Sequence, residues 1–433
     1  MSTTFSQASH WLKRLLGERD VAALGEALRP KPEVAGAPAL PRDLRVSPAL
    51  VRRRWALLGQ RLAALGMDAE GIGRVQRTLL DADSEAGMDG WARNIENFIG
   101  TVKLPVGIAG PLRVNGLFAQ GDYYLPLATT EAALVASYSR GAQLISRAGG
   151  ATTLLLNEGV SRAPGFAFAD LREAGAFVAW ALTRLDDFRA EAERTTAHGR
   201  LVDMQITVEG NHVYLRFEFH TGDAAGQNMV TLATAAICDY ILRNTPVAPA
   251  HWFVEANLSG DKKASAQSYL SVRGRKVTAE VRLEAALVEK MLHTTPARMV
   301  DYWRMSAIGG VLSGTIGVQG HYANGLAALY IACGQDAACV SESAVGVTRF
   351  ELAEDGGLYA SVTLPNLIVG TVGGGTGLPS QRACLALMGL AGSGNARAFA
   401  EVTAALLLGG ELSIIGALCA GHFARAHQSL ARG

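Results

Sequence analysis

The sequence has little of what several protein classes require. Its 433 residues include only 5 cysteines, with no Cys-x-x-Cys pair and no histidines at zinc-ligand spacing, so we expect a reduced cytoplasmic protein without a bound metal. Charged residues make up 18% and the formal net charge is +1, which gives no electrostatic footprint for nucleic acid or an anionic membrane. The first twenty residues lack a continuous apolar stretch, which argues against a secretory signal.

Only one long apolar run is present, from Val402 to Ala420, and Glu411 is its only charge. A transmembrane helix needs about 20 such residues, but this run carries Gly409 and Gly410 beside Glu411 at its centre. We therefore predict a buried central helix rather than a membrane span. Glu411 should then have a partner, because a buried unpaired carboxylate is costly.

The pattern of residues predicts an α+β protein with three parts. A helical N-terminal region occupies 1–95 and includes an amphipathic stretch from Ala49 to Leu65. A large helical domain, 96–163 and 254–433, is rich in glycine and alanine, so we expect its helices to cross closely around the buried helix. An insertion at 164–253 separates the two halves of this domain.

The insertion shows the order strand, helix, strand, strand, helix, strand. We expect its first helix at Leu171–Arg194 and its second at Asn228–Arg243, with a hairpin turn at Glu209-Gly210-Asn211 between the two middle strands. This βαββαβ order is typical of a ferredoxin-like domain.

A glycine-rich turn from Thr371 to Gly377 precedes Pro379, a favourable first helical residue. Such a turn lets backbone N–H groups approach a phosphate at a helix N-terminus. It is not a Rossmann fingerprint, because Leu378 replaces the third glycine, and it lacks the Gly-Lys of a P-loop. A second candidate turn, 221–229, enters the last helix of the insertion. A cofactor bound across both turns would need no Rossmann domain, although a simple packing turn fits the local pattern equally well.

The segment Asp261-Lys262-Lys263 follows a predicted strand, and a lysine held there would polarise a carbonyl group. Such triplets are more often plain surface turns. Glu131, Asp336 and His427 are further candidates for acid–base chemistry. Taken one at a time, they are explained equally well as a helix-start acid, a helix cap and a charge at a helix C-terminus.

These candidates belong to a longer series of segments. The segments are Glu96–Gly100 with Pro105–Gly107, Ala128–Glu131, Asp223–Met229, Asp261–Lys263, Ile331–Asp336, Gly370–Thr376 and Gly421–His427. They occur in the order seen in 3-hydroxy-3-methylglutaryl-coenzyme A (HMG-CoA) reductases. Over residues 90–432 the chain resembles this family, and it is more similar to the class I form than to the class II form, without that form's membrane anchor.

The resemblance implies a four-electron reduction, in which two NAD(P)H molecules convert an acyl thioester through a hemithioacetal and an aldehyde to an alcohol. Lys262 would stabilise the developing oxyanion. Glu131 would act as a general acid, with Asp336 hydrogen-bonded to it and to Lys262. His427 would protonate the departing thiolate.

The resemblance also implies binding residues, with Arg162 and Lys263 suited to a free carboxylate. The substrate side would comprise Arg162, Glu255, Asp261, Lys263, Arg304, Asn324, Ser137 and Arg140. The cofactor side, for NADPH or NADH, would comprise Asp223, Gly226, Asn228, Met229, Val372, Gly373, Gly374, Gly375, Thr376 and Arg432.

Some positions depart from the family pattern. Glu255 stands where the family usually has a serine, and a carboxylate there repels a substrate carboxylate unless a proton or another cation intervenes. Arg304 or Met305 replaces a substrate-binding lysine. The other departures are Thr101, Gln143 and His293 on the coenzyme A side and Ala197 near the expected 2'-phosphate. They predict weaker coenzyme A binding and leave open the choice between NADPH and NADH.

Three functions are compatible with the sequence. The leading one is reduction of HMG-CoA to mevalonate. The second keeps the same chemistry but acts on another acyl thioester, on coenzyme A or on a carrier protein. The third is a non-catalytic thioester or nucleotide sensor, against which the joint retention of Glu131, Lys262, Asp336 and His427 argues. Because family members build their sites between subunits, we expect a homodimer or homotetramer.

Overall fold

The computed structural model describes residues 39–421 and the single positions 6, 14, 23, 26 and 28–30 before them. The chain forms two compact units, Met1–Val102 and Lys103–Gly433. In the first unit, the described helices are α3 (Pro48–Ala64), α4 (Ala69–Leu79), α5 (Ala82–Ala86) and the 3-10 helix η1 (Met88–Trp91). Helix α3 confirms the predicted amphipathic stretch, and its buried residues Val51 and Trp55 pack in a small core with Phe98.

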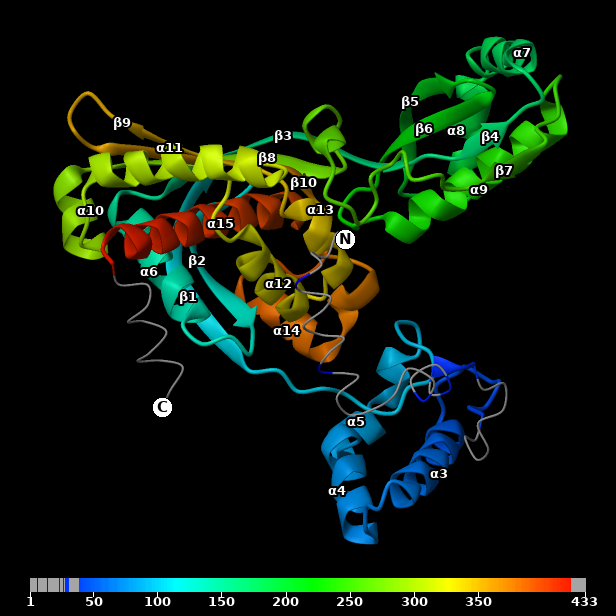
Figure 1. Cartoon of the computed structure of the whole chain (residues 1–433), viewed down its shortest axis with the longest axis horizontal. Coiled ribbons are helices and arrows are strands. Elements are labelled where there is room, and N and C mark those ends of the chain that lie inside the picture. Colours follow the sequence, from blue (N-terminus) through cyan, green and yellow to red (C-terminus); the bar gives the residue numbers. More distant parts are fainter. Residues whose placement is uncertain are drawn as a thin grey trace. The chain divides into compact units, whose positions relative to one another are not determined.

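The larger unit contains a mixed sheet (Figure 1). Its strands are β1 (Val106–Gly116), β2 (Gln120–Ala128), β3 (Ala151–Arg162), β8 (Gly274–Leu283), β9 (Val347–Leu352) and β10 (Leu358–Leu367). They lie in the order β2-β1-β3-β8-β10-β9, antiparallel except for the β1–β3 pair. We had predicted only helices in this part.

The composition of strand β1 shows why this strand was missed. Its sequence includes Gly107, Gly110 and Pro111, residue types that are rare in strands. Pro111 lies at a register irregularity in the pairing with β2, and the parallel pairing with β3 covers only Val114–Gly116. The proline therefore leaves no hydrogen bond of the β3 ladder unmade.

The insertion contains β4 (Gly165–Ala167), α7 (Leu171–Ala181), α8 (Leu185–Glu193), β5 (Arg200–Glu209), β6 (His212–His220), α9 (Gln227–Asn244) and β7 (His251–Phe253). Its antiparallel strands lie in the order β7-β4-β6-β5, and the last residues of β3 pair with β6. The predicted element order and hairpin are confirmed. The single first helix was wrong, because Thr183 bonds to the Trp180 carbonyl through both its backbone N–H and its hydroxyl and so ends α7.

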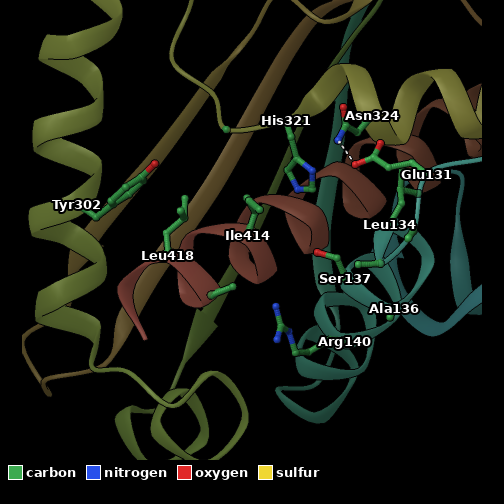
Figure 2. A pocket seen from close by; sticks show the side chains of 14 residues that line it. Glu131, Leu134, Ala136, Ser137, Arg140, Tyr302, His321, Asn324, Ile414 and Leu418 are labelled. Atoms are coloured by element: carbon green, nitrogen blue, oxygen red, sulfur yellow. Dashed lines mark hydrogen bonds between the residues drawn. The ribbon is translucent and has the colours of Figure 1, made fainter. Parts of the chain in front are cut away.

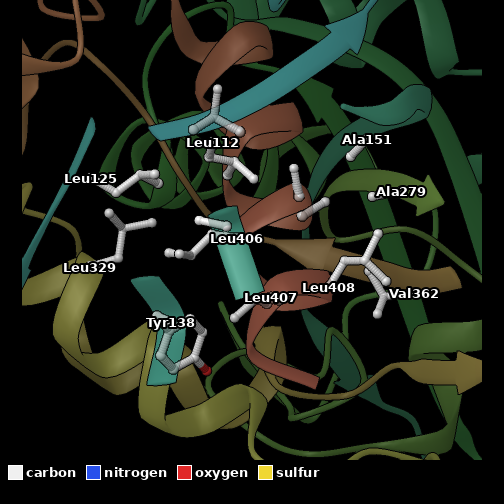
Figure 3. Packing of buried hydrophobic residues seen from close by; sticks show 14 of the residues in the cluster. Leu112, Leu125, Tyr138, Ala151, Ala279, Leu329, Val362, Leu406, Leu407 and Leu408 are labelled. Carbon is white, nitrogen blue, oxygen red and sulfur yellow. The ribbon is translucent and has the colours of Figure 1, made fainter. Parts of the chain in front are cut away.

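Helix α15 (Ala396–Cys419) is the predicted buried helix. It is long and apolar enough to cross a membrane, but 89% of its most apolar 18-residue stretch is buried inside the structure. The consecutive residues Leu406, Leu407 and Leu408 are all buried, so the helix is enclosed on every side (Figure 3). The α+β fold with a central buried helix is thus confirmed.

The partner predicted for Glu411 is also present. Its carboxylate is fully buried and accepts hydrogen bonds from the backbone N–H groups of Gly320 at 2.7 Å and His321 at 2.8 Å, and from the Thr348 hydroxyl at 2.7 Å.

The other helices of this unit are α6 (Leu134–Arg147), α10 (Ala285–Leu292), α11 (Pro296–Ser313), α12 (Tyr322–Ala332), α13 (Val340–Ser343) and α14 (Pro379–Leu387), with the 3-10 turns η2 (Ala266–Tyr269), η3 (Ala337–Cys339) and η4 (Gly374–Gly377).

Glycines allow α6 and α15 to cross at van der Waals distance. A Cβ added at Gly141 on α6 would lie 1.9 Å from the carbonyl oxygen of Gly409 on α15. We therefore expect Gly141→Ala to destabilise the protein by about 1–3 kcal/mol or more, because backbone must move to make room. Urea unfolding of the purified variant measures this loss.

The matched control is Gly175→Ala, on the exposed side of α7, where an added Cβ would meet no described atom within 4 Å. There the substitution should stabilise the protein by about 0.5–1 kcal/mol through helix propensity. Equal unfolding free energies for the two variants would contradict the close crossing.

Candidate active site

Lys262 lies in the loop after β7, and its side chain contacts Asp336. The Lys262 Nζ lies 2.8 Å from the Asp336 Oδ2, so this predicted contact is present. Asp336 is the N-cap of η3 and accepts a hydrogen bond from the Ala338 N–H through its other oxygen. The hydrogen bond to Asp336 raises the pKa of Lys262. The lysine is therefore a cation at neutral pH, suited to electrostatic stabilisation rather than to proton abstraction.

Arg162 ends strand β3 and faces two carboxylates. Its Nη1 lies 2.8 Å from the Asp261 Oδ2 and 3.5 Å from the Glu255 Oε2. Asp261 also accepts from Arg273 at 2.7 Å. Burial by itself would raise the pKa of Asp261, but Arg273 and Arg162 outweigh it and the pKa is lowered. Asp261 thus remains ionised between two guanidinium groups.

Glu255 occupies a defined position in this cluster. It accepts hydrogen bonds from the Ala163 N–H at 3.2 Å and the Asn257 N–H at 2.7 Å. A cation beside Glu255 would reduce its repulsion of a substrate carboxylate. Arg162 is such a cation. Lys263, which is exposed, donates through its Nζ to the Asp261 carbonyl at 2.9 Å.

A buried ion pair behind the lysine loop was not anticipated. Arg273 Nη1 lies 2.6 Å from each oxygen of Glu342, and both side chains are almost completely buried. The Glu342 Oε1 also accepts the backbone N–H of Lys262 at 3.1 Å. The sequence did contain a signal, because Glu342 is the only charge between Ala337 and Val347. A lone acid in an apolar stretch calls for a buried partner.

A second group of predicted residues lines a cavity of 420 Å³ between α6, α11, α12 and α15 (Figure 2). The Asn324 Nδ2 donates to the Glu131 Oε1 at 3.4 Å. On the opposite wall, Ser137 and Arg140 both bond to Ser413. The lining residues are Glu131, Ala132, Ala133, Leu134, Ala136, Ser137, Arg140, Tyr302, Gly320, His321, Asn324, Ile414, Ala417 and Leu418.

The two groups are not joined within the described part of the chain. Among the described residues, no hydrogen bond or ion pair links Glu131 to Lys262 or to Asp336, so the predicted contact between Glu131 and Asp336 is not made inside a single chain. Arg304 forms an exposed ion pair with Asp301 and is absent from the described cavity lining. His427 and Arg432 lie outside the described residues.

The two candidate cofactor turns pack against each other. Ala224 and Val372 form a parallel bridge, and the Thr371 N–H donates to the Asp223 carbonyl at 2.9 Å. The buried Arg275 donates to the carbonyl of Gly222 in one turn and to that of Val369, two residues before the other turn. Segments separated by about 150 residues of sequence are thereby held as one surface.

The glycine turn also reaches the segment that carries Asp336. A Cβ added at Gly334 would lie 2.3 Å from the Gly375 carbonyl oxygen. By contrast, Gly373 and Gly374 have φ of +75° and +54°, and a Cβ at either would meet no described atom within 4 Å. This backbone is therefore open on one side, at the start of η4, which precedes α14.

The remaining predicted cofactor residues lie around the same surface. Gly226, at φ +76°, precedes α9, and Asn228 and Met229 are in the first turn of that helix. Thr376 donates to the Gly373 carbonyl at 2.7 Å. The Asp223 carboxylate, however, accepts from the N–H groups of Gly394 and Ala396 at the start of α15. The Asp223 carboxylate therefore holds the start of α15.

The chain is similar to known proteins over most of its length. The family model for hydroxymethylglutaryl-coenzyme A reductase matches residues 61–432. The 3-hydroxy-3-methylglutaryl-coenzyme A reductase of Methanothermobacter thermautotrophicus is 46% identical over 344 residues, which is 79% of this chain and 86% of that protein. The enzyme of Aeropyrum pernix is 44% identical over 386 residues, 87% of this chain and 90% of that protein.

Solved structures show the same fold. The class II 3-hydroxy-3-methylglutaryl-CoA reductase of Streptococcus pneumoniae, in a structure bound to NADPH, superposes with a TM-score of 0.62 at 19% identity and covers 85% of this chain and 96% of its own. With the family model matching residues 61–432, this chain belongs to the hydroxymethylglutaryl-coenzyme A reductase family.

Proposed function

We propose that the chain catalyses the NAD(P)H-dependent, four-electron reduction of HMG-CoA to mevalonate. The observation that carries this proposal is the contact between Lys262 and Asp336 next to the packed glycine turns. A cation there lies beside a surface able to hold a dinucleotide. Family membership favours HMG-CoA over other acyl thioesters and over a sensor function.

The glycine surface fits a dinucleotide cofactor. The open backbone at Gly373 and Gly374 would accept phosphate oxygens ahead of α14, while Gly226, Asn228 and Met229 would contact the same cofactor from the start of α9. When bound, NADPH or NADH supplies hydride. We propose that 164–253 acts as the dinucleotide-binding insertion, since Gly226, Asn228 and Met229 lie within it at the start of α9. Its buried residues also belong to a hydrophobic core of their own.

The protein's residues would divide the polar chemistry. Lys262, a cation held by Asp336, would stabilise the oxyanion that develops when the thioester carbonyl is reduced. Glu131 would supply the proton to the substrate oxygen, with Asn324 fixing its carboxyl group. We assign to His427 the protonation of the departing thiolate.

The substrate would bind along both groups of residues. Arg162 and Lys263, with Asp261 between them, would face the carboxylate end of HMG-CoA. Ser137 and Arg140 would contact the coenzyme A portion in the cavity.

We propose that a second copy of the chain completes the site, in a homodimer or homotetramer. Within the described residues of one protomer, Glu131 has no contact with the lysine group. A two-fold partner would supply the missing half to each site. We also propose a cytoplasmic location, which is supported by the five cysteines being buried and free.

Replacing the lysine tests the assigned chemistry. Lys262→Ala should lower kcat with HMG-CoA about 10²-fold or more, because an oxyanion partner is lost. The control is Lys290→Ala, an exposed lysine of α10, which should retain wild-type kcat. Both are measured by oxidation of NADPH and of NADH. A loss of less than about tenfold from Lys262→Ala would argue against the assigned role.

Mixed oligomers test the shared site. Glu131→Gln and Lys262→Ala, each almost inactive alone, should recover about a quarter of wild-type kcat when co-expressed, because half of randomly mixed dimers are heterodimers with one intact site. Tandem affinity tags isolate the heterodimer. If the purified heterodimer is as inactive as the parents, both residues belong to a site within one chain.

The Glu255→Ser variant tests which acyl thioester is the native substrate. Glu255→Ser removes the acceptor of the Ala163 and Asn257 N–H groups and the partner of Arg162. For an enzyme adapted to HMG-CoA, we expect kcat/KM to fall about fivefold, the effect of about 1 kcal/mol of lost hydrogen bonding. A rise in kcat/KM for HMG-CoA would instead indicate that the native substrate is a different acyl thioester.

A further inference from the structure

Lys262 has a backbone conformation that needs external support. Its φ is +56°, in the left-handed region, where a residue with a Cβ costs about 1–2 kcal/mol relative to ordinary conformations. It follows Gly260 and Asp261 in a loop without regular structure. Such a conformation persists only when surrounding contacts determine it.

Glu342 provides the contact to the lysine backbone. Its Oε1 accepts the Lys262 N–H at 3.1 Å. The Glu342 side chain is itself fully buried, and Arg273 holds both of its oxygens at 2.6 Å. Arg273 also binds Asp261, the residue before the lysine, at 2.7 Å. The side chain of Asp261 and the backbone N–H of Lys262 are thus tied to one buried pair.

The same short segment also holds the far end of the lysine. Asp336 binds the Lys262 ammonium, and Glu342 binds its N–H. Between them lie only η3 (Ala337–Cys339) and the start of α13 (Val340–Ser343). Two successive helical turns keep the separation of the two carboxylates fixed. The lysine is therefore held at both ends by one rigid element.

We propose that Glu342 is a positioning residue for the reaction: it sets the left-handed backbone of Lys262 and thereby aims the ammonium at Asp336 and the substrate carbonyl. This inference rests on the proposed role of Lys262 in thioester reduction. Glu342 acts through the lysine and does not itself touch the substrate.

Glu342→Gln tests the proposal, because it removes the negative charge and places an N–H₂ donor against Arg273 where the second carboxylate oxygen accepts, which disturbs the oxygen that holds the Lys262 N–H. We expect kcat to fall about tenfold or more with KM for HMG-CoA within about twofold, since small misplacements of a catalytic group are costly for the chemical step. In a Lys262→Ala background, the same substitution should cost less than about twofold further. An equal cost in both backgrounds, or unchanged kcat in the single variant, would overturn the proposal.

Glu401→Gln is the matched control. Glu401 on α15 is also fully buried and accepts three backbone N–H groups, from Leu117, Phe118 and Ala119, at 2.8–3.2 Å. This variant should lose stability but keep wild-type kcat. If Glu342→Gln does not fold, Glu342→Leu combined with Arg273→Met leaves no unpaired buried charge. It should show the same loss of kcat, and wild-type kcat in this folded double variant would overturn the proposal.

Chemical labelling provides a readout that does not depend on the substrate. Acetylation by N-hydroxysuccinimide acetate, quantified by mass spectrometry against Lys290, should be about threefold faster or more at Lys262 in Glu342→Gln, because an ammonium released from Asp336 loses its raised pKa. Glu401→Gln should label as wild type does. An unchanged rate at Lys262 would overturn the positioning role. Lack of HMG-CoA turnover by the wild type would instead refute the proposed function, and the labelling would still decide the role of Glu342.

Discussion

The candidate site depends on a chain of charges that alternates in sign. Glu255, Arg162, Asp261, Arg273 and Glu342 are linked in that order by ion pairs of 2.6–3.5 Å. Because burying such charges is costly, this series of ion pairs is weak evidence for stability but strong evidence for a fixed geometry. The ion pairs connect β3, the loop that carries Lys262, and α13. They therefore fix the position of this irregular loop relative to the strand and the helix.

Helix α15 is the second support. It carries two fully buried carboxylates, and each is satisfied chiefly by backbone N–H groups rather than by a cation. Glu401 fixes the turn between β1 and β2. Glu411 fixes Gly320 and His321 just before α12, the helix that carries Asn324 to Glu131 (Figure 2). The segment that resembles a membrane span is thus a scaffold for the cavity.

Local patterns predicted some of this structure. The apolar run predicted the buried helix, and the turn at Glu209-Gly210-Asn211 predicted the hairpin. The resemblance carried by the ordered motifs predicted the contact between Lys262 and Asp336. In the central sheet, strand β1 was missed because it is rich in glycine and contains Pro111. Arg273 and Glu342 belong to no motif, and only the fold brings them together across 69 residues.

The central claim is that these elements together reduce a thioester to an alcohol with two hydride transfers. The most direct measurement supplies the purified protein with limiting HMG-CoA and excess NADPH or NADH, counts the cofactor oxidised and identifies the product by mass. The account predicts mevalonate and two oxidised cofactors for each HMG-CoA consumed. One oxidised cofactor with accumulation of the aldehyde, or consumption of another thioester but not of HMG-CoA, would contradict it.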